Sequence, residues 1–185
     1  MVKASRLRPI LSAVALIAAF AAAGVYWAEE VSAADAVKAP ENNEACFAPD
    51  EPCSQKLALF IASATVSLDI AIYDINEEQI VHAILVQAKK IPVRVIVDKR
   101  QSKGEHSSVA LLQKAGVPLK FGHQRGIMHD KFTLVDGKRL ETGSFNYTFH
   151  ASESNQENQL YLATPEVVNR YQARFERMWA AGRPQ

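Results

Sequence analysis

The chain has 185 residues, of which 48% are hydrophobic and 22% charged, and its 21 lysines and arginines nearly balance its 20 aspartates and glutamates. This composition excludes a collagenous, coiled-coil or disordered protein and a membrane protein with many spans. The length predicts a single domain held by a hydrophobic core, because two cysteines are too few to build a disulfide scaffold.

The N-terminus has the pattern of an export signal. Three basic residues precede an apolar stretch over residues 9–28, and Val31 and Ala33 form a small-residue cleavage site. We expect cleavage after Ala33 and a location outside the cytoplasm, either periplasmic or secreted. An uncleaved membrane anchor is the alternative, because an apolar stretch of about 20 residues can span a bilayer.

The signal, residues 1–33, is followed by a polar linker over residues 34–43 and by one predicted domain over residues 44–183. Removal of the signal takes away three basic and two acidic residues and leaves 18 of each sign. Contact with a polyanion would therefore depend on local clusters of charge rather than on an overall field.

Cys46 and Cys53 are the two cysteines of the chain. In an oxidising compartment a disulfide between them is favoured, and closing this short loop is worth about 2–3 kcal/mol. A zinc site is the alternative, but it requires two more ligands, and no further Cys or His lies nearby in the sequence.

Strands and helices alternate along the predicted domain. Strand patterns occur at residues 44–48, 66–73, 93–98, 117–121, 129–135, 139–142 and 159–163. Helix patterns occur at residues 54–64, 77–90, 107–115 and 165–180, with a short helix starting near Tyr147. Ser54 and Asn76 are expected to cap the first two helices, and a turn at Asp136 and Gly137 predicts a hairpin. The fold class is therefore α/β, with a mixed sheet flanked by helices.

Residues 129–146 concentrate the polar side chains that could perform chemistry. His129 and Lys131 are two positions apart on a predicted strand and should project from one face. A cation beside an imidazole favours its neutral, nucleophilic form and also binds an anion. Ser144 and Asn146 have the same spacing, so they could join Lys131 in holding the oxygens of a phosphodiester.

Two positions within this segment are assigned structural roles. Gly143 allows the backbone to approach the phosphate closely. Asp136 lies seven residues after His129, at the end of the predicted strand. We expect it to fix the turn or to pair with a basic neighbour.

These residues form the pattern H-x-K-x4-D-x6-G-S-x-N, and the sequence resembles the phospholipase D superfamily from about Cys46 to Trp179. It is similar to small bacterial endonucleases with a single motif and to mitochondrial cardiolipin-hydrolase-like members, also over residues 143–148 and 155–158. The resemblance implies a phospholipase D-like fold and hydrolysis through a phosphohistidine, with no cofactor. It also implies that Glu157 hydrogen-bonds the catalytic imidazole and sets its tautomer.

The implied mechanism needs two histidines, whereas the chain contains one copy of the motif. The resemblance therefore implies a C2 homodimer in which His129 is the nucleophile and the partner subunit's His129 is the general acid. Two Lys131 ammoniums, with no nearby cluster of acidic residues, would neutralise the phosphorane charge. We expect activity without a metal ion.

Nucleic acid is the expected substrate. Six basic residues on segments adjoining the motif could form a stripe that follows a nucleic-acid backbone: Lys99, Arg100, Lys103, Arg125, Lys138 and Arg139. His123 and Arg125 are further candidates for substrate contact. A phospholipid membrane is the alternative, held against the site by an uncleaved anchor. An inactive nucleic-acid-binding module is disfavoured by the intact motif.

Overall fold

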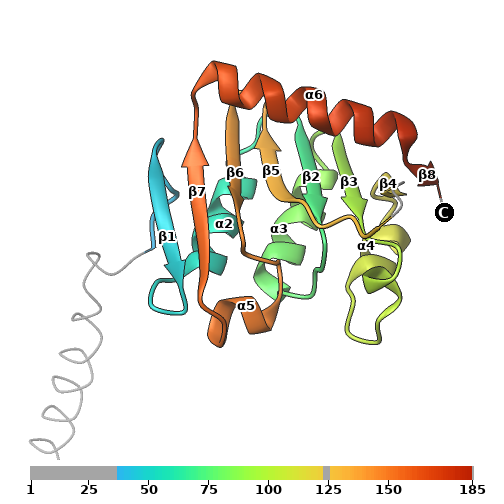
Figure 1. The fold of residues 1–185 in the computed structure, drawn as a ribbon, viewed down its shortest axis with the longest axis horizontal. Coiled ribbons are helices and arrows are strands. Elements are labelled where there is room, and N and C mark those ends of the chain that lie inside the picture. Colours follow the sequence, from blue (N-terminus) through green and yellow to red (C-terminus); the bar gives the residue numbers. More distant parts are fainter. Residues whose placement is uncertain (1–36, 123–125, 185) are drawn as a thin grey trace, which may run out of the picture. The chain divides into compact units, whose positions relative to one another are not determined.

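The computed structural model describes residues 37–122 and 126–184 (Figure 1). The predicted signal, the first part of the linker, His123 and Arg125 lie outside the described residues. Among the described residues, no helix has the length and apolar character that crossing a bilayer requires.

An eight-stranded mixed sheet forms the centre of the fold, in the order β1-β7-β6-β5-β2-β3-β4-β8. Its strands are β1 (Glu44–Ala48), β2 (Leu68–Ile72), β3 (Val93–Val97), β4 (Leu119–Phe121), β5 (Lys131–Val135), β6 (Arg139–Gly143), β7 (Glu157–Leu162) and β8 (Arg183–Pro184). Strands β2, β3 and β4 pair in parallel, and all other pairs are antiparallel. The predicted α/β class with a mixed sheet is confirmed.

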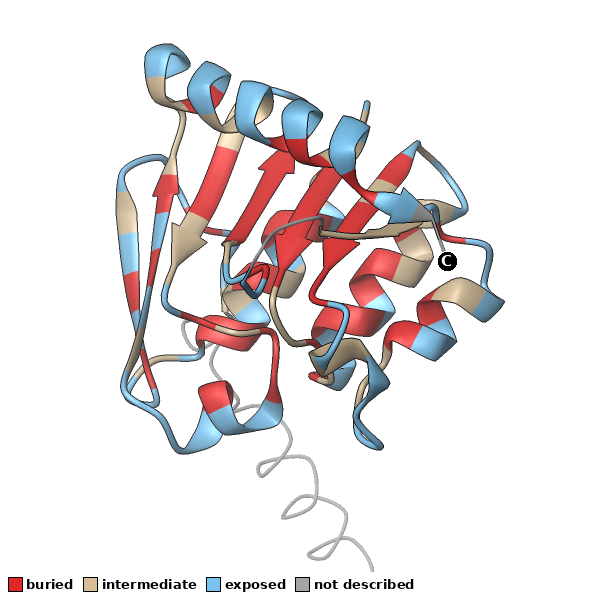
Figure 2. Ribbon diagram, turned by 45° about the vertical axis from the view of Figure 1, so that its right-hand side comes forward, coloured by how far each residue is buried: buried red, intermediate tan, exposed pale blue. Residues whose placement is uncertain are grey.

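Helices cover both faces of the sheet. They are α2 (Cys53–Ala62), α3 (Glu78–Ala88), α4 (Val109–Lys114), α5 (Phe149–Glu153) and α6 (Pro165–Ala181), with a 3₁₀ turn η1 (Gln101–Lys103). The long helix α6 crosses one face, and α2 and α3 lie side by side on the other (Figures 1 and 2). The central strands β2 and β5 are buried along their whole length, as expected for apolar strands between two helical layers.

The turn between β5 and β6 forms as predicted. Asp136 and Gly137 have φ values of 57° and 61°, the left-handed conformation that tight hairpin turns require at both central positions. The Asp136 carboxylate accepts hydrogen bonds from the backbone N–H groups of Thr65 (2.9 Å), Val66 (2.7 Å) and Ser67 (3.1 Å). Asp136 therefore anchors the hairpin to the segment that leads into β2.

The predicted caps, Ser54 and Asn76, are wrong. Ser54 lies inside α2, which begins at Cys53 without a side-chain cap. Pro52 occupies the N-cap position, and Cys53 forms the predicted disulfide with Cys46 of β1. The Asn76 side chain instead accepts the backbone N–H of Phe149 (3.0 Å) and so joins α5 to the start of α3.

Candidate active site

The motif residues meet at one edge of the sheet, where β2 and β6 end and β5 and β7 begin. In the sheet register, Ile72 of β2 faces Lys131 of β5, and Gly143 of β6 faces Gln159 of β7. Because β5 and β6 are antiparallel neighbours, the start of one strand and the end of the other reach the same edge.

His129 and Lys131 do not share a regular strand as predicted, because β5 begins only at Lys131. His129 is exposed, whereas Lys131 is 8% exposed. The Lys131 Nζ donates to the His129 carbonyl oxygen at 3.1 Å. The Tyr73 ring contacts both, with its centroid 4.8 Å from that of the His129 ring and 5.2 Å from Lys131 Nζ. Tyr73 thus fixes the relative position of the two groups.

The Lys131 side chain is largely buried and has no carboxylate partner in an ion pair among the described residues. Burial lowers the pKa of Lys131 below its ordinary value, and the negative charges of Glu157 and Asp130 offset only part of this effect. Within the described residues Lys131 forms no ion pair. Buried charges are normally paired, so this site favours the entry of an anion.

Ser144 and Glu157 lie together beside this cation. The Ser144 hydroxyl hydrogen-bonds one carboxylate oxygen of Glu157, and the Asn155 side-chain amide donates to the other at 3.0 Å. In this single chain Glu157 therefore does not make the expected hydrogen bond to the His129 imidazole. The Ser144 backbone N–H donates to the Asn158 carbonyl oxygen at 3.1 Å.

Gly143 makes this arrangement possible. A Cβ at this position would collide with the carbonyl oxygen of Asn158 on β7, so only glycine permits the close approach of the two strands. Asn146 follows β6 in a loop, and its buried Oδ1 has no hydrogen-bond partner among the described residues. Ser144 is exposed and Asn146 half-buried. Both follow the end of β6, so the rule that strand residues two apart point to one side does not apply to them.

Two supporting residues, Asp98 and Tyr73, are missing from the sequence-based prediction. The Asp98 carboxylate accepts the backbone N–H groups of Met128 (2.9 Å), Arg100 (2.8 Å) and Gln101 (3.0 Å). Burial opposes its ionisation, but these donors outweigh burial and lower the pKa of Asp98. Asp98 therefore anchors Met128, the residue before His129. Tyr73 and Asp98 directly follow the parallel strands β2 and β3, and the carboxyl ends of parallel strands commonly carry functional side chains.

A buried polar cluster underlies the loop after β6. The Tyr147 hydroxyl donates to Glu141 at 2.8 Å and lies 2.6 Å from the Thr133 hydroxyl. The Tyr147 backbone N–H donates to the Asp74 carbonyl oxygen at 3.1 Å. Burial raises the pKa of Glu141 to about 8, so its carboxyl group is largely protonated at neutral pH. The cluster ties the loop that contains Asn146 to the end of β2.

The predicted basic stripe is only partly present at the site. Lys99, Arg100 and Lys103 follow β3 at the same edge as Asp98 and are exposed. Lys138 and Arg139 lie at the opposite end of β6, and Arg139 donates to the Ser63 hydroxyl at 2.7 Å. The length of a five-residue strand, about 17 Å, separates them from Ser144, so they do not border the motif residues within one chain.

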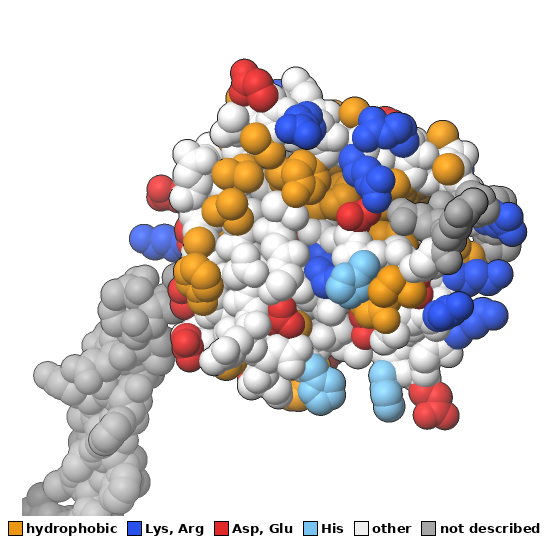
Figure 3. Space-filling view, viewed as in Figure 1, with side chains coloured by type: hydrophobic (Ala, Val, Ile, Leu, Met, Phe, Trp, Pro, Cys, Tyr) orange, Lys and Arg blue, Asp and Glu red, His pale blue; other side chains and the backbone are white. Residues whose placement is uncertain are grey.

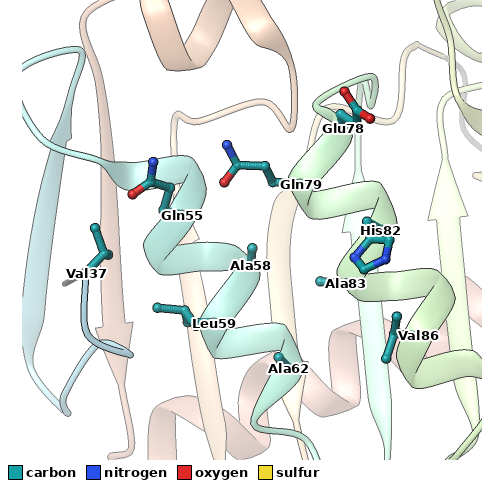
Figure 4. Close-up of a pocket in the computed structure, with 10 residues that line it drawn as sticks. All are labelled: Val37, Gln55, Ala58, Leu59, Ala62, Glu78, Gln79, His82, Ala83 and Val86. Carbon is teal, nitrogen blue, oxygen red and sulfur yellow. The ribbon is translucent and has the colours of Figure 1, made fainter. Parts of the chain in front are cut away.

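A cavity of about 610 Å³ lies between α2 and α3 (Figure 4). Apolar residues of both helices line it together with the polar Gln55, Glu78, Gln79 and His82, and none of the motif residues does. Among the described residues, no three His, Cys, Asp or Glu side chains converge to form a metal site. The chemical groups therefore concentrate at the edge that contains His129.

Comparisons with known proteins identify the family of this chain. Residues 57–179 match the family described as cardiolipin synthase, PLD-like domain. The chain is 34% identical over 131 residues to a mitochondrial cardiolipin hydrolase of Danio rerio, covering 70% of this chain and 58% of that protein. It is 31% identical over 127 residues to a phospholipase D of Rickettsia conorii, covering 68% and 64%. The chain thus spans less than two thirds of these relatives.

Among solved structures, the fold is similar to Nuc, a phospholipase D family member of Salmonella typhimurium. The TM-score is 0.71 at 27% identity, and the match covers 76% of this chain and 95% of Nuc. NucT of Helicobacter pylori gives a TM-score of 0.69 at 26% identity, covering 76% and 97%. The chain therefore belongs to the phospholipase D superfamily, a class of phosphodiesterases.

Proposed function

We propose that this protein hydrolyses phosphodiester bonds of nucleic acids through a phosphohistidine on His129, without a metal ion. The observation that carries this proposal is the pairing of an exposed imidazole with a buried ammonium, that of Lys131, which has no carboxylate partner among the described residues. The substrate phosphate would supply the missing negative charge and would lie within reach of the nucleophile.

The proposed reaction has two steps. An imidazole nitrogen of His129 bonds to phosphorus, the bond to the leaving oxygen breaks, and that oxygen takes a proton from the partner's His129. Water then bonds to phosphorus and gives its proton to the partner's His129 as the phosphorus–nitrogen bond breaks. Lys131 and Ser144 would hold the non-bridging oxygens, with Asn146 as a further donor.

This reaction requires a homodimer whose two His129 side chains meet at the twofold axis. His129 is exposed at the edge of the sheet, which leaves room for a second imidazole. Glu157 would orient an imidazole once the Ser144 hydroxyl gives up its hydrogen bond to Glu157 and binds the phosphate instead.

We also propose that the domain acts outside the cytoplasm. The Cys46–Cys53 disulfide supports this location.

Exposed positive charge supports nucleic acid as the substrate. Figure 3 shows Lys and Arg side chains gathered on the face of the molecule that α6 crosses. Phospholipid is the second candidate, since the relatives include a cardiolipin hydrolase and a phospholipase D. Ile127 is 41% exposed and Phe149 60% exposed. They lie near the motif in sequence and could insert into a lipid surface.

Cleavage assays with the full chain test both candidates. In EDTA, we expect the protein to cut plasmid DNA or a single-stranded oligonucleotide and not to hydrolyse cardiolipin vesicles. His129→Asn should lower turnover on the order of 10⁴-fold and abolish a radiolabelled covalent adduct, with an unchanged circular dichroism spectrum. His82→Asn, the same change at an exposed histidine of α3, is the control. Full activity of His129→Asn would contradict the assignment.

A further inference from the structure

Helix α6 presents a row of arginines on the flank that faces the start of β5. Val168, Phe175 and Met178 of this helix are buried. Arg170, Arg174 and Arg177 are exposed, and their spacing of four and three residues places them on one stripe. From first to last they extend about 10 Å along the helix.

These arginines line a cleft of about 470 Å³ between α6 and the start of β5, together with Asp130, Phe132, Val167 and Tyr171. The rings of Phe132 and Tyr171 pack edge to face, with centroids 5.1 Å apart. Asp130, which stands between His129 and Lys131 in the sequence, accepts a hydrogen bond from Arg174 at 3.0 Å. Asp130 therefore brings the cleft next to His129 and Lys131 in the sequence, although neither of these two residues lines it. We call it the α6 arginine cleft.

The charges of the α6 arginine cleft remain available for a ligand. Arg170 and Arg177 form no ion pair with any described residue. The side chains of Arg174 and Asp130 are 44% and 34% exposed, and such surface pairs contribute little stability. By contrast, Arg94 on the sheet beneath the helix is fully engaged with Asp69 and Glu176. Arg94 thus has its carboxylate partners within the fold, whereas Arg170 and Arg177 have none among the described residues.

We propose that the α6 arginine cleft holds the phosphodiester backbone of the nucleic-acid strand next to the scissile bond. This inference rests on the function proposed above. Guanidinium groups bind phosphate oxygens in bidentate fashion, and about 10 Å corresponds to about three nucleotides at ~3.4 Å of rise each. The cleft is concave, so a strand can enter it and a flat bilayer cannot. Its contacts are to phosphates and make binding independent of base sequence.

Binding of a fluorescein-labelled single-stranded oligonucleotide to the inactive His129→Asn chain tests the inference. Adding Arg170→Ala and Arg177→Ala should raise Kd about tenfold or more. The slope of log Kd against the logarithm of the salt concentration should decrease by about 1.4, because each contact to a single-strand phosphate contributes about 0.7 to that slope. Lys89→Ala with Lys90→Ala removes the same charge at exposed positions after α3 and should change Kd less than about twofold.

The outcomes separate this inference from the proposed function. If the wild-type chain cuts the oligonucleotide and both double variants bind it equally, the cleft has no role and the inference is overturned, while the nuclease function stands. If the arginine variant alone loses affinity but the wild-type chain cuts only cardiolipin vesicles, the cleft binds nucleic acid without presenting it for cleavage, so the proposed substrate and the inference are both wrong. If binding to cardiolipin vesicles, measured in parallel, is what the arginine variant alone loses, the cleft binds lipid and the inference is overturned.

Discussion

At the residue scale, the site combines an imidazole that is free to react with a cation that is held in place. Lys131 is 8% exposed and its Nζ is fixed by the His129 carbonyl oxygen and the Tyr73 ring. A charge that is already desolvated and oriented loses little on binding phosphate, which makes its electrostatic stabilisation more effective than that of a mobile surface lysine.

Glu141 makes the stability of the fold depend on pH. Burial raises its pKa from 4.5 to about 8, so the folded state keeps a proton that the unfolded chain releases. The resulting stabilisation is fully present below about pH 4.5, decreases as pH rises and is lost by about pH 8. Urea unfolding between these values should show a free energy of unfolding that falls with pH.

Glu141→Gln keeps the shape of the side chain but removes the titration. We expect its free energy of unfolding to vary less with pH than that of the wild-type chain, with a slope reduced by up to about 1.4 kcal/mol per pH unit. Glu105→Gln, at an exposed loop position, should retain the wild-type slope. Equal slopes in Glu141→Gln and the wild-type chain would contradict the burial of a protonated carboxyl group.

At the scale of elements, the position of α6 depends on one ion-pair network. Arg94 of β3 donates to both carboxylate oxygens of Asp69, each at 2.8 Å, and to Glu176 of α6 at 2.6 Å. Its guanidinium also stacks 4.9 Å from the centroid of the Phe175 ring. The side chain of Asp69 is 7% exposed, so it depends on this cation for charge compensation.

Arg94→Ala should lower the free energy of unfolding by about 3 kcal/mol, because it leaves the buried Asp69 carboxylate without its cation. Chemical denaturation measures this loss. Arg94→Met combined with Asp69→Leu should recover most of it, since apolar residues of similar size often replace a buried ion pair without cost. If the single variant were as stable as the wild-type chain, α6 would be held by its apolar contacts alone.

The elements differ in how far the sequence predicts them. The apolar strands β2 and β3 and the amphipathic helix α6 follow their periodicity closely, because burial of apolar side chains determines them. The helix caps at Ser54 and Asn76 are mispredicted, since Ser54 lies within α2 and the Asn76 side chain bonds α5 instead. His129 lies before β5 rather than within the strand predicted for residues 129–135, in the segment that Asp98 anchors through Met128.

At the scale of the whole molecule, the proposed homodimer predicts how activity depends on mixing. Wild-type and His129→Asn chains co-expressed in equal amounts would form dimers at random. If each site needs both histidines, about a quarter of the wild-type activity remains, whereas independent subunits would keep about half. Sedimentation measures the oligomer, and His82→Asn mixed in the same way should retain full activity. A fully active monomer would exclude the shared site.

The sequence by itself determined the chemistry and the fold class. The spacing of His129, Lys131 and Ser144 indicates a phosphodiester site, and the alternation of strands and helices indicates a mixed α/β sheet. Both are local patterns, which the chain carries whether or not it is folded.

Only the tertiary structure decided which charges accompany that site. Arg139 lies eight residues after Lys131 in the sequence but at the other end of the strands, because β5 runs away from the edge that contains His129 and β6 begins where β5 ends. Arg174 follows Lys131 by more than 40 residues, yet it contacts Asp130 because α6 packs across the face of β5. Distance along a chain does not give distance in space once strands reverse and a helix crosses them.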